Sequence, residues 1–108
     1  YQKIFTNREL LYFKDGASAN ISVLETKESE PQRILLVNGK PDASSVKDMP
    51  TQLLVGHIPM LIHKKPEKVF VIGLGSGSTV GAVLSHDVND VIVSEIYKEV
   101  IDADKFFE

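Results

Sequence analysis

The fold is decided by the stretch Val69-Phe70-Val71-Ile72-Gly73-Leu74-Gly75-Ser76-Gly77, in which an apolar run passes directly into three glycines. The apolar run predicts a buried strand. The glycines predict a turn too tight for a Cβ, which lets the backbone approach a ligand at the start of the next helix. A second apolar run, Val91-Ile92-Val93-Ser94, ends at Glu95. Because a carboxylate at the tip of the neighbouring strand can accept both hydroxyls of a ribose, the pattern predicts a nucleoside-binding site.

The spacing of the glycines narrows the class of cofactor. Gly73, Gly75 and Gly77 form G-x-G-x-G, whereas the dinucleotide fingerprint is G-x-G-x-x-G and residue 78 is Ser. A glycine-rich turn alone is weak evidence, but here strand, turn, helical segment, strand and terminal Glu follow in order. The spacing therefore favours an S-adenosyl cofactor over NAD.

Composition excludes several classes of protein. The chain has 108 residues, is 43% hydrophobic and 25% charged, and has the composition of an ordinary globular protein. Its net charge is −3, so we expect no basic surface that binds nucleic acid. It has no cysteine, and His63 and His86 lack metal-ligand spacing, so we expect no metal. The longest apolar stretch, residues 53–62, is too short to span a bilayer, and no signal peptide is evident. We expect a cytoplasmic location for this piece.

The limits of the chain also bear on its organisation. It begins at Tyr1 rather than Met and stops after a second predicted βα unit. A doubly wound sheet needs more strands than this to cover both of its faces. We therefore expect the chain to be a truncated piece of a longer protein.

The first segment, residues 1–47, predicts an antiparallel β-hairpin subdomain. Polar and apolar residues alternate there in short runs bounded by turn formers. Residues 33–37 form an apolar run that predicts a strand buried on both faces, and residues 41–47 lack periodicity and predict a loop. The predicted turns are Asp15-Gly16, Glu28-Ser29-Glu30-Pro31 and Asn38-Gly39.

The second segment, residues 48–108, predicts the first part of a Rossmann-like sheet of the S-adenosylmethionine methyltransferase type, so the fold class is α/β. Asp48 is expected to cap a helix over residues 51–58 that Pro59 strains or ends. A second helix is expected from Ser78, and residues 97–107 predict a second crossover helix. The side chains expected to face the core or the sheet are Leu53, Leu54, Ile58, Leu61, Ile62, Val80, Val83 and Leu84.

Several short motifs, in this order, resemble the spermidine and spermine synthases, the polyamine aminopropyltransferases. The motifs are Tyr1-Gln2-Lys3-Ile4, Gly39, Asp48, Gln52, Gly56-His57-Ile58-Pro59, the turn at Gly73, Glu95-Ile96, Val100-Ile101 and Lys105-Phe106-Phe107. The resemblance covers essentially the whole chain. It implies a small β domain, through which subunits assemble, ahead of a Rossmann-like fold. The implied reaction moves an aminopropyl group from decarboxylated S-adenosylmethionine to a diamine, leaves methylthioadenosine and needs no metal.

The resemblance also implies roles for individual residues. Gln2 matches a glutamine that contacts the nucleoside, the glycine turn matches the cofactor turn, and Glu95 matches the ribose-binding acid. Gln52 matches a residue of the substrate gate, and with Ser76 it completes the expected cofactor-binding set. The family's catalytic Asp falls beyond Glu108, so no catalytic residue is expected in this chain.

Three positions depart from the family pattern. Ser76 stands where the synthases have Asp in G-G-G-D-G, an anion that helps to hold the cationic aminopropyl chain. Losing that charge removes a contact of about 1.5 to 3 kcal/mol. Thr51 replaces the gate tyrosine, and Tyr97 replaces an Asp. His57 is expected to be a hydrogen-bonded packing residue rather than a base.

Three functional classes follow from these patterns. The first is an aminopropyltransferase-like enzyme acting on decarboxylated S-adenosylmethionine. The second is a methyltransferase that uses S-adenosylmethionine, in which Ser76 would be unremarkable. The third is a non-catalytic homologue that binds a nucleoside or oligomerises. The expected partners are a small nucleoside, a polyamine and further copies of the same chain, but no nucleic acid.

Overall fold

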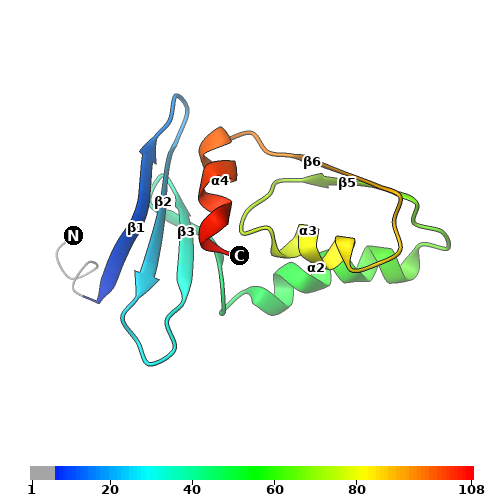
Figure 1. The fold of residues 1–108 in the computed structure, drawn as a ribbon, viewed down its shortest axis with the longest axis horizontal. Coiled ribbons are helices and arrows are strands. Elements are labelled where there is room, and N and C mark those ends of the chain that lie inside the picture. Colours follow the sequence, from blue (N-terminus) through cyan, green and yellow to red (C-terminus); the bar gives the residue numbers. More distant parts are fainter. Residues whose placement is uncertain (1–6) are drawn as a thin grey trace.

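The computed structural model describes residues 7–108, so the expected contact of Gln2 with a nucleoside lies outside the described residues. An antiparallel sheet of order β1-β2-β3-β4 forms the first part of the fold (Figure 1). Its strands are β1 (Arg8–Asp15), β2 (Asn20–Thr26), β3 (Arg33–Val37) and β4 (Lys40–Ser44). The predicted hairpins are confirmed, as is the burial of β3, whose three central residues are all buried.

The turns of this sheet follow from their residues. Asn38 and Gly39 both have positive φ, 50° and 76°, which is the geometry that a two-residue hairpin turn requires. At the first turn the backbone N–H of Gly16 donates to the carbonyl of Ala19 over 2.9 Å. Backbone preferences at these turns thus favour hairpins that place each strand beside the next one along the chain.

The loop expected over residues 41–47 is wrong, because its first part is strand β4. Pro41 pairs with Leu36 and Ala43 with Leu35, and the register shifts between the two pairs. Strand β4 is an edge of the sheet, where a residue without a backbone N–H is tolerated. The sequence pattern did not predict β4, because Pro41 is atypical of a strand and the segment shows no periodicity.

The second part of the fold contains a parallel two-stranded sheet with two helices lying on one side of it (Figure 1). Strand β5 (Lys68–Ile72) pairs in parallel with β6 (Asp90–Ser94). The helices are α2 (Met49–Ile62) and α3 (Ser78–Leu84), and they pack closely against each other. The α/β class expected from the sequence is confirmed.

Helix α2 is longer than expected, because it continues through Pro59 to Ile62. Pro59 has no N–H to donate to the preceding turn. The helix nevertheless carries on, and the N–H of His63 donates to the Pro59 carbonyl over 3.0 Å. One missing hydrogen bond therefore does not end this helix.

The last helical segment does not return along the parallel sheet as the expected crossover helix would. Helix α4 (Lys98–Ala103) packs against β2 of the antiparallel sheet, and the short 3₁₀ segment η1 (Asp104–Phe106) follows it (Figure 1). Val100 and Ala103 join the main hydrophobic core together with Ile21, Val23 and Leu35. This core draws on residues from both sides of the expected boundary at residue 47, which stays a prediction.

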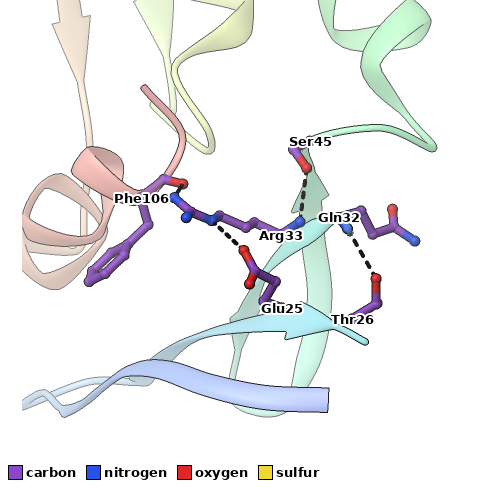
Figure 2. A network of polar contacts seen from close by, with 6 residues as sticks. All are labelled: Glu25, Thr26, Gln32, Arg33, Ser45 and Phe106. Carbon is purple, nitrogen blue, oxygen red and sulfur yellow. Dashed lines mark hydrogen bonds and ion pairs between the residues drawn. The ribbon is translucent and has the colours of Figure 1, made fainter. Parts of the chain in front are cut away.

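A polar contact reinforces this packing. The Arg33 guanidinium pairs with Glu25 over 2.9 Å and donates to the carbonyl of Phe106 over 2.6 Å (Figure 2). The ring of Phe106 in turn packs against Tyr12, with 5.7 Å between ring centroids. Arg33 therefore links two strands of the sheet to the end of the chain.

Several side chains expected in the core are exposed instead. Every second residue of β5 and β6 is exposed, including Phe70 and Ile72, because the helices cover only one face of these strands. The expectation that helix side chains face the core or the sheet is also wrong for five exposed residues: Leu54, Ile58, Leu61, Ile62 and Leu84. Val83 of α3 is buried as expected.

Candidate functional site

The glycine turn has the backbone geometry expected of it. Gly73, Gly75 and Gly77 all lie in the left-handed region, with φ of 87°, 57° and 79°. That region is strained for any residue with a Cβ. The N–H of Gly77 closes the turn on the carbonyl of Leu74 over 2.9 Å, and Gly73 is exposed. The turn therefore offers open backbone to a ligand.

Glu95 lies next to this turn, at the end of β6. One carboxylate oxygen, Oε2, accepts a hydrogen bond from the N–H of Leu74 over 2.8 Å. The other, Oε1, accepts from the N–H of Tyr97 over 3.0 Å. Each carboxylate oxygen has two lone pairs, so both can still accept a hydroxyl. The half-buried carboxylate is thus held in place while keeping acceptor capacity.

The structure brings Gln52 and Ser76 together, but each is engaged with the other. The Ser76 hydroxyl donates to Gln52 Oε1 and lies 2.9 Å from the hydroxyl of Ser78. Gln52 Nε2 donates to the carbonyl of Ser44 over 2.8 Å and to Asp48 Oδ1 over 3.0 Å. This network ties the glycine turn to α2 and to the end of β4. Both side chains are polar contacts within the fold, and their contact with a cofactor stays a prediction.

The capping role expected of Asp48 is wrong. Asp48 does occupy the position before α2, yet its side chain caps no N–H of that helix. Oδ1 instead accepts from the backbone N–H of Ser44 over 2.9 Å and from the Ser44 hydroxyl. Because Gln52 reaches the same oxygen, Asp48 fixes the polar network rather than the helix end.

Sequence reasoning missed Asp104, which packs against the glycine turn from η1. A Cβ placed on Gly77 would lie 2.7 Å from Asp104 Oδ1, so the carboxylate touches the turn directly. It lines a small cavity of about 210 Å³ with Ser76, Ser78 and Glu108. Burial, and secondarily the nearby Glu108, raise the pKa of Asp104. No sequence motif predicts this role for Asp104, because the residue reaches the glycine turn only through the packing of η1.

His57 is confirmed as a packing residue. Its Nδ1 lies 2.8 Å from Nε2 of His86, and the two rings meet edge to face with 5.1 Å between centroids. The pair joins α2 to the loop that follows α3. It lies away from the glycine turn and takes no part in the candidate site.

Residues 7–108 contain neither a metal-binding group nor a membrane-spanning helix. No three His, Asp or Glu side chains in this part of the chain gather as a metal-binding group. None of its helices has the length and apolar character to cross a membrane.

Comparisons with known proteins identify the family. The family model described as "Spermine/spermidine synthase domain" matches residues 49–107. The chain belongs to this family. The match begins at α2 and includes the glycine turn, Glu95 and α4.

Individual relatives support the assignment. A polyamine aminopropyltransferase of Archaeoglobus fulgidus is 30% identical over 100 residues, which cover 93% of this chain and 36% of the relative. One from Caldicellulosiruptor bescii is 34% identical over 87 residues, which cover 80% of this chain and 31% of the relative. The chain thus spans about a third of the length of the relatives that it matches.

Solved structures share the fold. Spermidine synthase from Thermotoga maritima superposes with a TM-score of 0.80 at 26% identity, over 91% of this chain and 34% of that one. A spermidine synthase in complex with the transition state analogue AdoDATO gives a TM-score of 0.80 at 27% identity, over 89% of this chain and 33% of that one. The similarity extends beyond the residues matched by the family model, into the antiparallel sheet.

Proposed function

We propose that the glycine turn and Glu95 bind the nucleoside part of decarboxylated S-adenosylmethionine, and that the whole protein transfers its aminopropyl group to an amine. The observation that carries this proposal is the bond between Glu95 and the Leu74 N–H, which holds a carboxylate beside an open turn. The names of the relatives support the reaction class.

The proposed contacts follow from the geometry of the turn. The free lone pairs of Glu95 would accept the two ribose hydroxyls, and charge-assisted bonds of this kind are the stronger ones. Gly73 has open space where a Cβ would stand, so a ligand can approach the backbone there. The chain's own contribution is thus to bind and orient the nucleoside.

The proposed reaction is a direct displacement. The amine nitrogen forms a bond to the methylene carbon beside the sulfonium, and the carbon–sulfur bond breaks to leave methylthioadenosine. The proton lost by the amine passes to a carboxylate, which by family resemblance is an Asp beyond Glu108. Positioning of the two reactants and an electrostatically prepared groove would provide most of the rate.

Methyl transfer from S-adenosylmethionine is the second candidate function, and Ser76 favours it. In the turn, the position that resembles the family's Asp carries a buried neutral hydroxyl that donates to Gln52. No carboxylate from the turn itself would therefore favour the ammonium of a decarboxylated cofactor.

The nucleoside site is tested by calorimetric titration of methylthioadenosine into the protein and into Glu95→Ala. We expect binding to weaken by about 2 kcal/mol, roughly 30-fold, the scale of paired hydrogen bonds to a charge. Glu67→Ala is the matched control, because the Glu67 side chain is exposed and its carboxylate pairs with Lys65 at the surface. Circular dichroism checks that Glu95→Ala keeps the secondary structure of the wild type. Unchanged affinity in folded Glu95→Ala would overturn the assignment.

A further inference from the structure

The turn between β3 and β4 is formed by Asn38 and Gly39. Both residues are exposed, and both have positive φ, 50° and 76°. A Cβ placed on Gly39 would meet no atom within 4 Å. Solvent therefore reaches both residues of this turn.

A hydrogen bond holds the side chain of Asn38 in place. The backbone N–H of Asn20 donates to Asn38 Oδ1 over 2.9 Å, and the Asn38 N–H donates back to the Asn20 carbonyl over 2.9 Å. A donor fixed at the amide oxygen stabilises the negative charge that develops there when a nucleophile attacks the side-chain carbon Cγ. The bond to Asn20 therefore activates this amide as well as orienting it.

Asn38 differs in two respects from Asn89, an exposed asparagine in the loop after α3. Asn38 is the only asparagine of the sequence that a glycine follows, whereas Asp90 follows Asn89. The N–H of Asp90 donates to the carbonyl of Glu67 over 3.1 Å. No backbone acceptor among residues 7–108 takes the N–H of Gly39. The nitrogen that follows Asn38 is thus free to react, and the nitrogen that follows Asn89 is held.

We propose that Asn38 is a site of spontaneous deamidation, in which the backbone nitrogen of Gly39 attacks the side-chain carbon of Asn38. A carbon–nitrogen bond forms between the two atoms and closes a cyclic imide, while the bond from Cγ to Nδ2 breaks. The departing nitrogen takes the proton of the Gly39 N–H and leaves as ammonia. Water then opens the imide at either carbonyl, which yields Asp or isoaspartate without oxidation or reduction.

The turn supports each part of this reaction. Gly39 has no side chain to hinder the approach of its nitrogen, and a glycine backbone rotates with little steric cost. The Asn20 N–H stabilises the charge that forms on Oδ1. Ammonia leaves directly into solvent, because Asn38 is exposed.

Deamidation changes the fold beyond the turn itself. Isoaspartate carries the main chain through its side-chain carbons, so it lengthens the turn by a methylene group. A two-residue hairpin turn matches the twist of its strands only with a particular backbone geometry. Strand β4 ends at Ser44, which contacts Asp48 and Gln52. Isoaspartate at residue 38 thus loosens the polar network beside the glycine turn, whatever reaction the protein performs.

The test follows the wild-type protein during incubation in mildly alkaline buffer made with heavy-oxygen water. Peptide mapping by mass spectrometry measures the conversion of amide to carboxylate at each asparagine. Conversion at Asn38 is expected to be at least about tenfold faster than at Asn89, because glycine has no Cβ beside the attacking nitrogen. Endoproteinase Asp-N distinguishes the products, since it cleaves at Asp and not at isoaspartate, and both products are expected.

Two variants are matched controls for the turn. Asn38→Gly keeps a two-residue turn that tolerates positive φ and has no amide to lose, so its urea unfolding midpoint should stay constant during incubation. Freshly prepared Asn38→Asp carries the new charge on a normal main chain. The isoaspartate fraction of the incubated wild type should unfold at a lower urea concentration than Asn38→Asp does.

A parallel incubation in urea separates the effect of the fold from that of the sequence. Conversion of Asn38 only in the unfolded protein, or equal conversion at Asn38 and Asn89 in the folded protein, would overturn the proposed site. An isoaspartate fraction that is as stable as Asn38→Asp would overturn the loosening of β4.

Discussion

Ser76 is one of three residues at which this chain departs from the motif that the family resemblance implies. It is 5% exposed, and its hydroxyl donates to the side-chain oxygen of Gln52. A carboxylate at this position would face that oxygen rather than a donor, with Asp48 bound to the same glutamine. The surroundings of residue 76 therefore suit a neutral hydrogen-bond donor such as Ser. The replacement of the family's Asp by Ser fits the acceptor that Gln52 presents here.

Ser76→Asp is predicted to shift cofactor preference. The ratio of affinity for decarboxylated S-adenosylmethionine over S-adenosylmethionine should rise by about tenfold or more, because a carboxylate in the turn favours the free ammonium. The unliganded protein should lose about 1–3 kcal/mol, since the new charge lies buried against an acceptor. Titration of both cofactors measures the ratio, and Ser85→Asp at the far end of α3 is the charge control. A strong preference of the wild type for the decarboxylated form would count against this prediction.

At the scale of elements, the contact between α2 and α3 holds the candidate site in shape. Gly56 lies so close to α3 that a Cβ there would be 2.7 Å from both the Ala82 Cβ and the Thr79 carbonyl oxygen. The Thr79 hydroxyl donates to the carbonyl of Gln52 over 2.8 Å, and His57 meets His86 farther along. Gln52, which accepts the hydrogen bond from Ser76, thus lies in a helix that packs tightly against α3.

Gly56→Ala is predicted to destabilise the protein and Gly81→Ala to stabilise it. The first substitution overpacks the helix contact and should cost about 1–3 kcal/mol. The second adds a methyl group in open space within α3, where alanine is favoured over glycine by about 0.5–1 kcal/mol. Urea unfolding of the two variants and the wild type measures both changes. Equal stability of the two variants would mean that α2 and α3 pack less closely than described.

At the scale of the whole molecule, the chain exposes more surface than a compact protein of its size. Its accessible surface is 7532 Å², against roughly 6,000 Å² expected for 12.0 kDa. Its radius of gyration is 15.2 Å, against about 13 Å expected. Three exposed large apolar side chains, Phe70, Ile72 and Ile92, lie on the open face of β5 and β6, where Ile72 is 83% exposed. Exposed apolar side chains gathered on one face of a sheet are typical of interfaces.

The chain is therefore predicted to self-associate in solution through this open face. Sedimentation velocity at increasing concentration should show a dimer or a larger species. Ile72→Lys should shift the distribution toward monomer, because it places a charge on the open face. Phe13→Lys, which changes an exposed aromatic residue of β1, is the control. A monomer at every concentration would contradict the prediction, and an effect of Phe13→Lys alone would move the interface to β1.

Local sequence patterns determined much of this protein. They predicted the hairpin turns, the buried strand β3, the glycine turn and the position of Glu95 at the end of β6, and the motif order indicated the family. These features depend on neighbours in the chain. A positive φ at Gly39 or Gly77 is a property of one residue, and strand periodicity extends over a few.

Only the tertiary structure decided which distant groups meet. Ser76 donates to Gln52, Asp48 binds Ser44 instead of capping α2, and Asp104 touches the turn at Gly77. Burial was decided in the same way. An apolar side chain is buried only if another element covers it, and no periodic pattern states that α4 packs on β2 while one face of β5 and β6 stays open.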